Sequence, residues 1–145
     1  MSTTTTPVRV TAPSHRQLRS RAFAVTAAVL AAFVVWSVAV PLLGVDLTVR
    51  TTPGGNTAQT IGPAFVLAVS LLASLLGWGL LAGLERRTHR AGTIWTITAG
   101  VVLLGSLTGP LTAAVTTAAA VALVLLHLSV AAVLIPLLRR TASPR

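Results

Sequence analysis

Four long apolar runs, separated by short polar or charged stretches, dominate the 145-residue chain. A helix of about 20 apolar residues is long enough to cross the hydrocarbon core of a bilayer. The first run is longer than the ~7–15-residue apolar segment of a signal peptide, so we interpret it as a retained membrane span. The pattern therefore predicts an all-α membrane fold, a four-helix transmembrane bundle with spans at residues 22–43, 63–84, 92–108 and 113–138.

The connections between the runs differ in character. Apolar and polar residues alternate after residue 44, which is the period of a strand, and residues 53–56 read Pro-Gly-Gly-Asn, a turn signal. These features predict a short β-hairpin between the first and second helices, at the outer mouth of the bundle. The second connection is charged, and Gly109-Pro110 predicts an uncharged turn. Residues 1–21 are expected to be a disordered tail and residues 139–145 a second short tail.

Composition agrees with a membrane location. The chain is 54% hydrophobic and only 9% charged, whereas a soluble domain carries roughly 25% charged residues. A chain this apolar cannot cover its own surface with polar groups in water. It contains no cysteine, which excludes disulfides, thiolate metal sites and cysteine nucleophiles.

The placement of arginine predicts the orientation. All eleven basic residues are arginine, and only Arg50 falls on the outer side of the predicted topology. Because cytoplasmic loops are enriched in basic residues, both termini are expected in the cytoplasm. The remaining ten are Arg9, Arg16, Arg19, Arg21, Arg86, Arg87, Arg90, Arg139, Arg140 and Arg145. Since they gather at helix ends, we expect contact with anionic phospholipid at the cytoplasmic face of the lipid bilayer and no nucleic-acid partner.

His127 is the polar residue that the membrane makes most costly, because it lies near the middle of the fourth run. Its neighbours on the same helix are apolar, so we expect a partner on another helix. Ser70, Ser74, Thr98 and Ser106 lie at a similar depth. One interpretation is a hydrogen bond that fixes helix register, and the other is a proton relay or ligand contact. No metal site is expected, because one histidine cannot form a closed shell of ligands.

Two other groups of charged residues are candidates. Glu85, at the end of the second run, precedes Arg86 and Arg87, and we expect interfacial ion pairs there. Asp46 lies four residues before Arg50 in the outer connection. It is expected either to make a turn contact or an ion pair, or to form an outer-mouth binding site close to the Gly-Pro turn.

Tryptophan and small residues indicate how the helices sit and pack. Trp95 opens the third run, and we interpret it as an interfacial anchor. Small residues recur at four-residue spacing in every run, which is typical of closely packed membrane helices. We interpret most of them as packing within the bundle, with Gly79 and Gly83 the best candidates for a dimer face.

No residue pattern indicates catalysis or a cofactor. The chain lacks a glycine-rich phosphate loop. Its one aspartate lies outside the membrane while His127 lies near the middle, so a Ser/His/Asp triad is implausible. We therefore expect a non-enzymatic structural, interaction or accessory subunit that acts as a homo-oligomer or with a membrane protein partner. The alternative is a small-solute or lipid transporter with a polar pocket around His127.

Several short stretches resemble a known family. They are residues 44–47 (GVDL), 77–81 (GWGLL), 84–86 (LER), Trp95, 106–111 (SLTGPL), 126–128 (LHL) and 133–136 (VLIP). In this order and spacing the chain resembles a largely actinobacterial family of short four-helix integral membrane proteins, classified as a domain of unknown function. The resemblance implies this fold and a bacterial cytoplasmic membrane, and it implies no activity.

Overall fold

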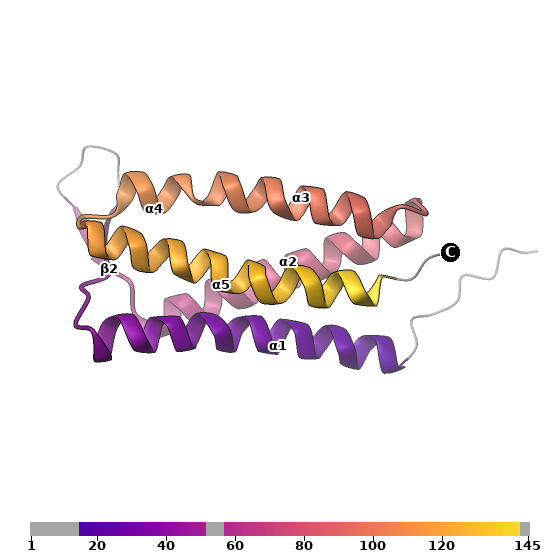
Figure 1. The fold of residues 1–145 in the computed structure, drawn as a ribbon, viewed down its shortest axis with the longest axis horizontal. Coiled ribbons are helices and arrows are strands. Elements are labelled where there is room, and N and C mark those ends of the chain that lie inside the picture. Colours follow the sequence, from indigo (N-terminus) through magenta and orange to yellow (C-terminus); the bar gives the residue numbers. More distant parts are fainter. Residues whose placement is uncertain (1–14, 52–56, 143–145) are drawn as a thin grey trace, which may run out of the picture.

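Four helical rods lie side by side along the longest axis of the molecule (Figure 1). The structure is a computed structural model that describes residues 15–51 and 57–142. The rods are α1 (His15–Ser37) continued by a π-helical turn η1 (Val38–Leu42), α2 (Pro63–Arg87), α3 (Ala91–Ser106) continued by α4 (Thr108–Ala113), and α5 (Thr117–Thr141). Each rod is long and apolar enough to cross a membrane. The predicted all-α, four-helix membrane fold is confirmed.

A short hairpin joins the first and second rods, as the alternating pattern predicts. Strands β1 (Thr48–Arg50) and β2 (Ala58–Thr60) pair antiparallel, with Val49 opposite Gln59. The predicted turn at residues 53–56 lies outside the described residues. The backbone N–H of Val115 donates to the carbonyl oxygen of Thr48 over 3.1 Å, which ties the hairpin to the segment after α4. We call this end of the bundle the hairpin end, and the opposite end, which carries Arg86, Arg87, Arg139 and Arg140, the arginine end.

Both predicted tails are shorter than expected. Helix α1 begins at His15, so the prediction of a disordered tail is wrong for residues 15–21, while residues 1–14 lie outside the described part. At the other terminus α5 continues to Thr141. Polar and basic side chains do not prevent a helix from extending past the apolar run, because Arg and Gln are good helix formers.

The predicted turn at Gly109-Pro110 is wrong, because both residues lie inside α4. Pro110 is the third residue of that helix, where a missing backbone N–H costs little. The third span therefore runs from Ala91 to Ala113. The chain reverses after it, and Thr116 caps α5 by accepting a hydrogen bond from the backbone N–H of Ala119 over 3.1 Å.

The helices cover one another unevenly. Ala24, Ala28 and Ala32 are buried on one face of α1, which confirms the predicted packing role of small residues on this helix. The rod formed by α3 and α4 is the least covered, with 11% of its most apolar stretch buried against 22–28% in the other three. Helix α2 lies behind α5 and crosses it obliquely (Figure 1).

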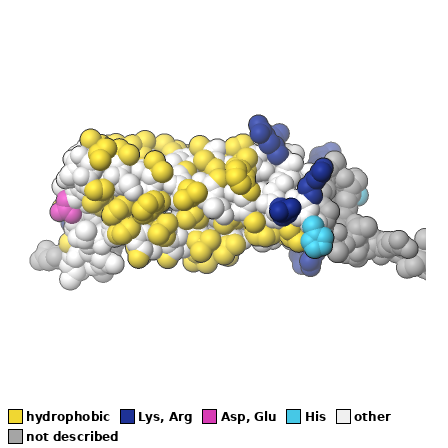
Figure 2. Space-filling model, turned by 90° about the horizontal axis from the view of Figure 1, so that it is seen from below, with side chains coloured by type: hydrophobic (Ala, Val, Ile, Leu, Met, Phe, Trp, Pro, Cys, Tyr) yellow, Lys and Arg dark blue, Asp and Glu magenta, His cyan; other side chains and the backbone are white. Residues whose placement is uncertain are grey.

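The molecular surface has the distribution expected of a membrane protein. Figure 2 shows apolar side chains along the length of the bundle, basic side chains at one end and an acidic side chain at the other. Large side chains such as Leu72, Leu76 and Leu104 are more than half exposed on this surface. In a bilayer these groups face lipid tails, which are as apolar as they are.

Candidate functional site

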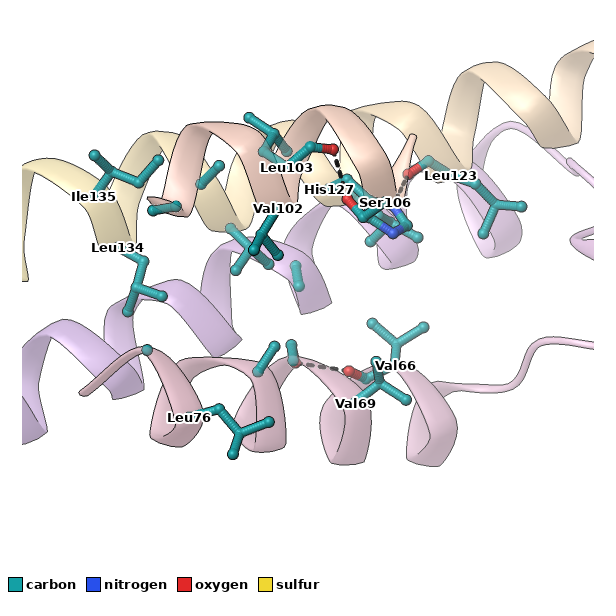
Figure 3. A pocket seen from close by; sticks show the side chains of 18 of the residues that line it. Val66, Val69, Leu76, Val102, Leu103, Ser106, Leu123, His127, Leu134 and Ile135 are labelled. Atoms are coloured by element: carbon teal, nitrogen blue, oxygen red, sulfur yellow. Dashed lines mark hydrogen bonds between the residues drawn. The ribbon is translucent and has the colours of Figure 1, made fainter. Parts of the chain in front are cut away.

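A cavity of about 570 Å³ lies between α2, α3 and α5. Its volume is within the range of about 300–1,000 Å³ that small-molecule sites occupy. Figure 3 shows Val66, Val69 and Leu76 of α2 on one side of the space and the labelled residues of α3 and α5 on the other. The lining is apolar except for Ser70, Thr98, Ser106 and His127. The indole of Trp95 also contributes to the wall.

The cavity opens sideways between α2 and α3. The lining residues Val69, Leu76 and Val102, which belong to these two helices, are 48–65% exposed. The lining residues Ala32 of α1 and Leu126 of α5 are buried. The floor is therefore formed by α5 and α1, while the rim belongs to α2 and α3. Because these helices are long enough to cross a membrane, the opening faces the lipid.

The imidazole of His127 lies in the wall of this cavity. Its Nδ1 is 2.7 Å from the carbonyl oxygen of Leu123, one turn earlier on α5 (Figure 3). The expectation of a partner on another helix is thus wrong for this nitrogen. A carbonyl oxygen can only accept, so Nδ1 carries the hydrogen and, in a neutral ring, Nε2 is an acceptor. Among the described residues, no hydrogen-bond partner is found for Nε2.

Three of the four hydroxyl residues predicted at the depth of His127 lie with it in the cavity wall. Ser70, Thr98 and Ser106 line the cavity. Each hydroxyl donates within its own helix, to the carbonyl oxygens of Val66 over 2.6 Å, Ile94 over 2.9 Å and Leu103 over 2.7 Å respectively. Such local bonds satisfy a hydroxyl in an apolar medium.

Ser74 is separated from this group. Its side chain is fully buried, it is not part of the cavity wall, and its Oγ has no hydrogen-bond partner among the described residues. A buried hydroxyl without a partner costs about 1–3 kcal/mol. The sequence placed Ser74 at the right depth but could not give the direction of its side chain.

Trp95 is a core residue, so its interpretation as an interfacial anchor is wrong. It is 1% exposed, and its indole N–H donates to the backbone carbonyl of Gly77 over 2.8 Å. This bond joins α3 to α2 where both line the cavity, on the arginine side. A Cβ placed on Gly77 would lie 3.5 Å from Leu134 and 3.8 Å from Trp95, which is ordinary van der Waals contact, so this position has room for a methyl group.

Glu85 forms an ion pair with Arg21 of α1, a partner that the sequence did not predict. Nη2 of Arg21 lies 2.6 Å from Oε1 of Glu85, and the two side chains are 3% and 14% exposed. Nε of Arg21 also donates to Oγ1 of Thr141 over 3.2 Å. The neighbouring Arg86 and Arg87 are exposed. Together these contacts of Arg21 with Glu85 and Thr141, which we call the Arg21 node, join α1, α2 and α5 at the arginine end.

Sequence reasoning missed Arg21 because it was assigned to the tail. A signal was present, since Arg21, Ala24 and Ala28 follow helical spacing and share the buried face of α1. Continuing that periodicity back from the alanines would have placed Arg21 among the helices.

Of the alternatives expected for Asp46, the described residues show the turn contact and not the ion pair with Arg50. Asp46 accepts a hydrogen bond from Oγ1 of Thr48 over 2.5 Å, which is the expected turn contact. Arg50 is exposed at the end of β1, and within the described ranges no ion pair joins it to Asp46. Strand β1 does lie against α4, where Val49 bridges to Ala114. The hairpin is therefore near the Gly-Pro segment, as predicted.

Metal-binding clusters are not found in residues 15–51 and 57–142, where no three side chains of His, Cys, Asp or Glu come together. The two acidic residues of the chain, Asp46 and Glu85, lie at opposite ends of the bundle. The cavity wall contains neither of them.

The four apolar rods define a multi-pass membrane protein of the all-α class. Residues 12–144 match a family of unknown function, DUF6069, so the chain belongs to that family. No curated protein and no solved structure matches it.

Proposed function

We propose that the protein is a non-enzymatic membrane protein that binds a lipid-like molecule in the lateral cavity around His127. The observation that carries this proposal is the direction of the opening. Val69, Leu76 and Val102 surround an entrance between α2 and α3 that faces the bilayer rather than water. A molecule dissolved in the membrane can enter there without crossing a polar end of the bundle.

This geometry favours a lipid over a small polar solute, which was the other part of the transporter hypothesis. A polar solute leaving water needs several polar partners to replace its hydration. Most of the cavity wall consists of alkyl groups, such as those of Leu123, Leu126 and Leu134.

The blocking substitution Val102→Trp tests this proposal. Val102 lines the cavity at its rim and is 63% exposed, while Val101 is 64% exposed and does not line it. Released from bacterial membranes in a mild detergent, the wild-type protein should retain one lipid-like molecule in native mass spectrometry. Val102→Trp should reduce the retained fraction at least tenfold, which corresponds to about 1.4 kcal/mol.

The control is Val101→Trp, which adds the same side chain to the lipid-facing surface one residue away. It should retain the molecule as the wild type does. Equal retention in both variants would assign the molecule to the general lipid belt and refute the cavity as a binding site.

An accessory subunit is the second candidate, favoured by the poor cover of α3. A Cβ on Gly100 or Gly105 of this helix would meet no other atom, so a further helix could approach closely. The same holds for Gly79 and Gly83 on α2, the proposed dimer face. A stable homodimer that excludes lipid from the cavity in the same mass spectra would support this candidate instead.

We also propose a bacterial, actinobacterial cytoplasmic membrane with both termini in the cytoplasm, on the strength of the arginine distribution and the family resemblance. At the arginine end, exposed Arg86, Arg87, Arg139 and Arg140 then face anionic phospholipid headgroups. On this proposal Glu85 and its ion pair lie at the same cytoplasmic interface.

Cysteine labelling tests this orientation, because the natural chain contains no cysteine. Thr57→Cys lies in the hairpin connection and His89→Cys in the charged connector, and both positions are exposed. In intact cells a membrane-impermeant maleimide should label Thr57→Cys, and it should label His89→Cys only after permeabilisation. The reverse pattern would invert the proposed topology.

A further inference from the structure

The polar groups of the cavity share one property. Every side-chain hydrogen-bond donor in its wall donates to a backbone carbonyl of the protein. The hydroxyls of Ser70, Thr98 and Ser106 and Nδ1 of His127 bond within their own helices, and the indole of Trp95 bonds to Gly77. Within the described part of the chain, no donor reaches the lone pairs on the three hydroxyl oxygens and on Nε2 of His127.

A ligand complementary to this wall must therefore donate a hydrogen bond. Carbonyl and ether oxygens offer only lone pairs, so they would leave Nε2 without a partner and lose their own hydration. An ammonium group would donate, but the cavity wall contains no carboxylate to balance its charge. A neutral hydroxyl group fulfils both conditions.

The depth of the acceptor limits the ligand further. His127 lies ten residues after the start of α5 at Thr117, which places it about 15 Å along the helix axis. A phosphate headgroup does not reach that depth in a bilayer, because its charge keeps it at the interface. The hydroxyl must belong to a molecule that is otherwise hydrocarbon.

We infer that the cavity selects a neutral lipid alcohol, whose hydroxyl donates to Nε2 of His127, over carbonyl and ether lipids of the same shape. This inference rests on the proposed lipid-binding function. It adds the chemical class of the ligand and assigns His127 as the residue that recognises it.

A pair of matched probes tests the inference: stearyl alcohol and its methyl ether, which differ only in the hydroxyl hydrogen and one methyl group. The purified full-length protein is placed in phosphatidylcholine nanodiscs, and binding is measured by native mass spectrometry with both probes in competition. The alcohol should bind about three- to tenfold more tightly, the range that one net hydrogen bond provides.

The variant His127→Leu should lose this preference and bind both probes with similar affinity, because the apolar wall remains. Ser129→Ala is the matched control, since Ser129 is on the same helix, bonds to the carbonyl of Leu126 and does not line the cavity. It should keep the wild-type preference. A preference that survives in His127→Leu would remove His127 from recognition and overturn the inference.

The outcomes separate this inference from the function on which it rests. Equal binding of alcohol and ether to the wild type, blocked by Val102→Trp, would overturn the inference and leave lipid binding intact. Binding of neither probe to the wild type would refute both, as would a second copy of the chain filling the cavity. If His127→Leu does not fold, the comparison of the two probes on the wild-type protein still tests whether the cavity prefers the alcohol to the ether.

Discussion

Replacing Glu85 by leucine should lower the free energy of unfolding by about 3–5 kcal/mol, the usual cost of removing one partner of a buried ion pair. The guanidinium of Arg21 would then remain between helices with no carboxylate beside it. Its side chain is 3% exposed, so water cannot replace the lost partner without local opening. The effect should be large because three helices meet at this node, α1 through Arg21, α2 through Glu85 and α5 through Thr141.

Unfolding in mixed detergent micelles, followed by circular dichroism, measures this loss. Arg86→Leu is the control, because Arg86 is the next residue on α2 and is exposed. The double variant Arg21→Leu with Glu85→Leu should regain most of the stability, since neither charge is then buried alone. A double variant as unstable as Glu85→Leu would show that the lost packing, rather than the unpaired charge, causes the effect.

The spans were predictable because a bilayer crossing requires an uninterrupted apolar run. The ends of the helices were harder to predict, because they depend on contacts with residues outside the apolar runs. Pro110 looks like a turn residue, but in the first turn of α4 its missing N–H is no loss, and the helix continues to Ala113. Arg21 looks like part of a polar tail until Glu85 of another helix is placed beside it.

The candidate site was predictable in its residues but not in its shape. Depth along the helices grouped His127 with Ser70, Thr98 and Ser74, and of these hydroxyl residues Ser70 and Thr98 line the cavity with His127 while Ser74 does not. The cavity itself depends on how obliquely α2 crosses the bundle. In a membrane both the helix faces that pack together and those that meet lipid are apolar, so the sequence carries no clear amphipathic pattern from which that crossing could be derived.

Short local bonds also escaped prediction. A histidine in a membrane helix was expected to need a partner on another helix, yet Nδ1 of His127 bonds to the carbonyl of Leu123 in its own helix. Ser70 and Thr98 do the same with carbonyls one turn earlier. Side chains of this length can reach back to the preceding turn, which satisfies a donor without any tertiary contact. This local solution is what leaves the acceptor atoms of the cavity without donors.

Truncating Trp95 to alanine is expected to destabilise the bundle by about 3–5 kcal/mol, the range measured for Trp and Phe truncations in protein cores. Trp95 is among the largest fully buried side chains, bonds to Gly77 of α2 and belongs to the same core cluster as Leu134 and Leu138 of α5. Trp95→Phe should cost much less, about 0.5–1.5 kcal/mol, if its main loss is the indole hydrogen bond to Gly77.

Trp36→Ala is the matched comparison for this prediction. Trp36 also donates its indole N–H to a backbone carbonyl, that of Ile61 over 3.2 Å, but its side chain is only half-buried. Measured in the same micellar unfolding assay, Trp36→Ala should therefore lose less stability than Trp95→Ala. Equal losses would mean that lipid or detergent fills the space left by Trp95. In that case the wall between the cavity and the arginine end would be open to the membrane in the variant. The cavity would then have a larger volume than the 570 Å³ of the wild type.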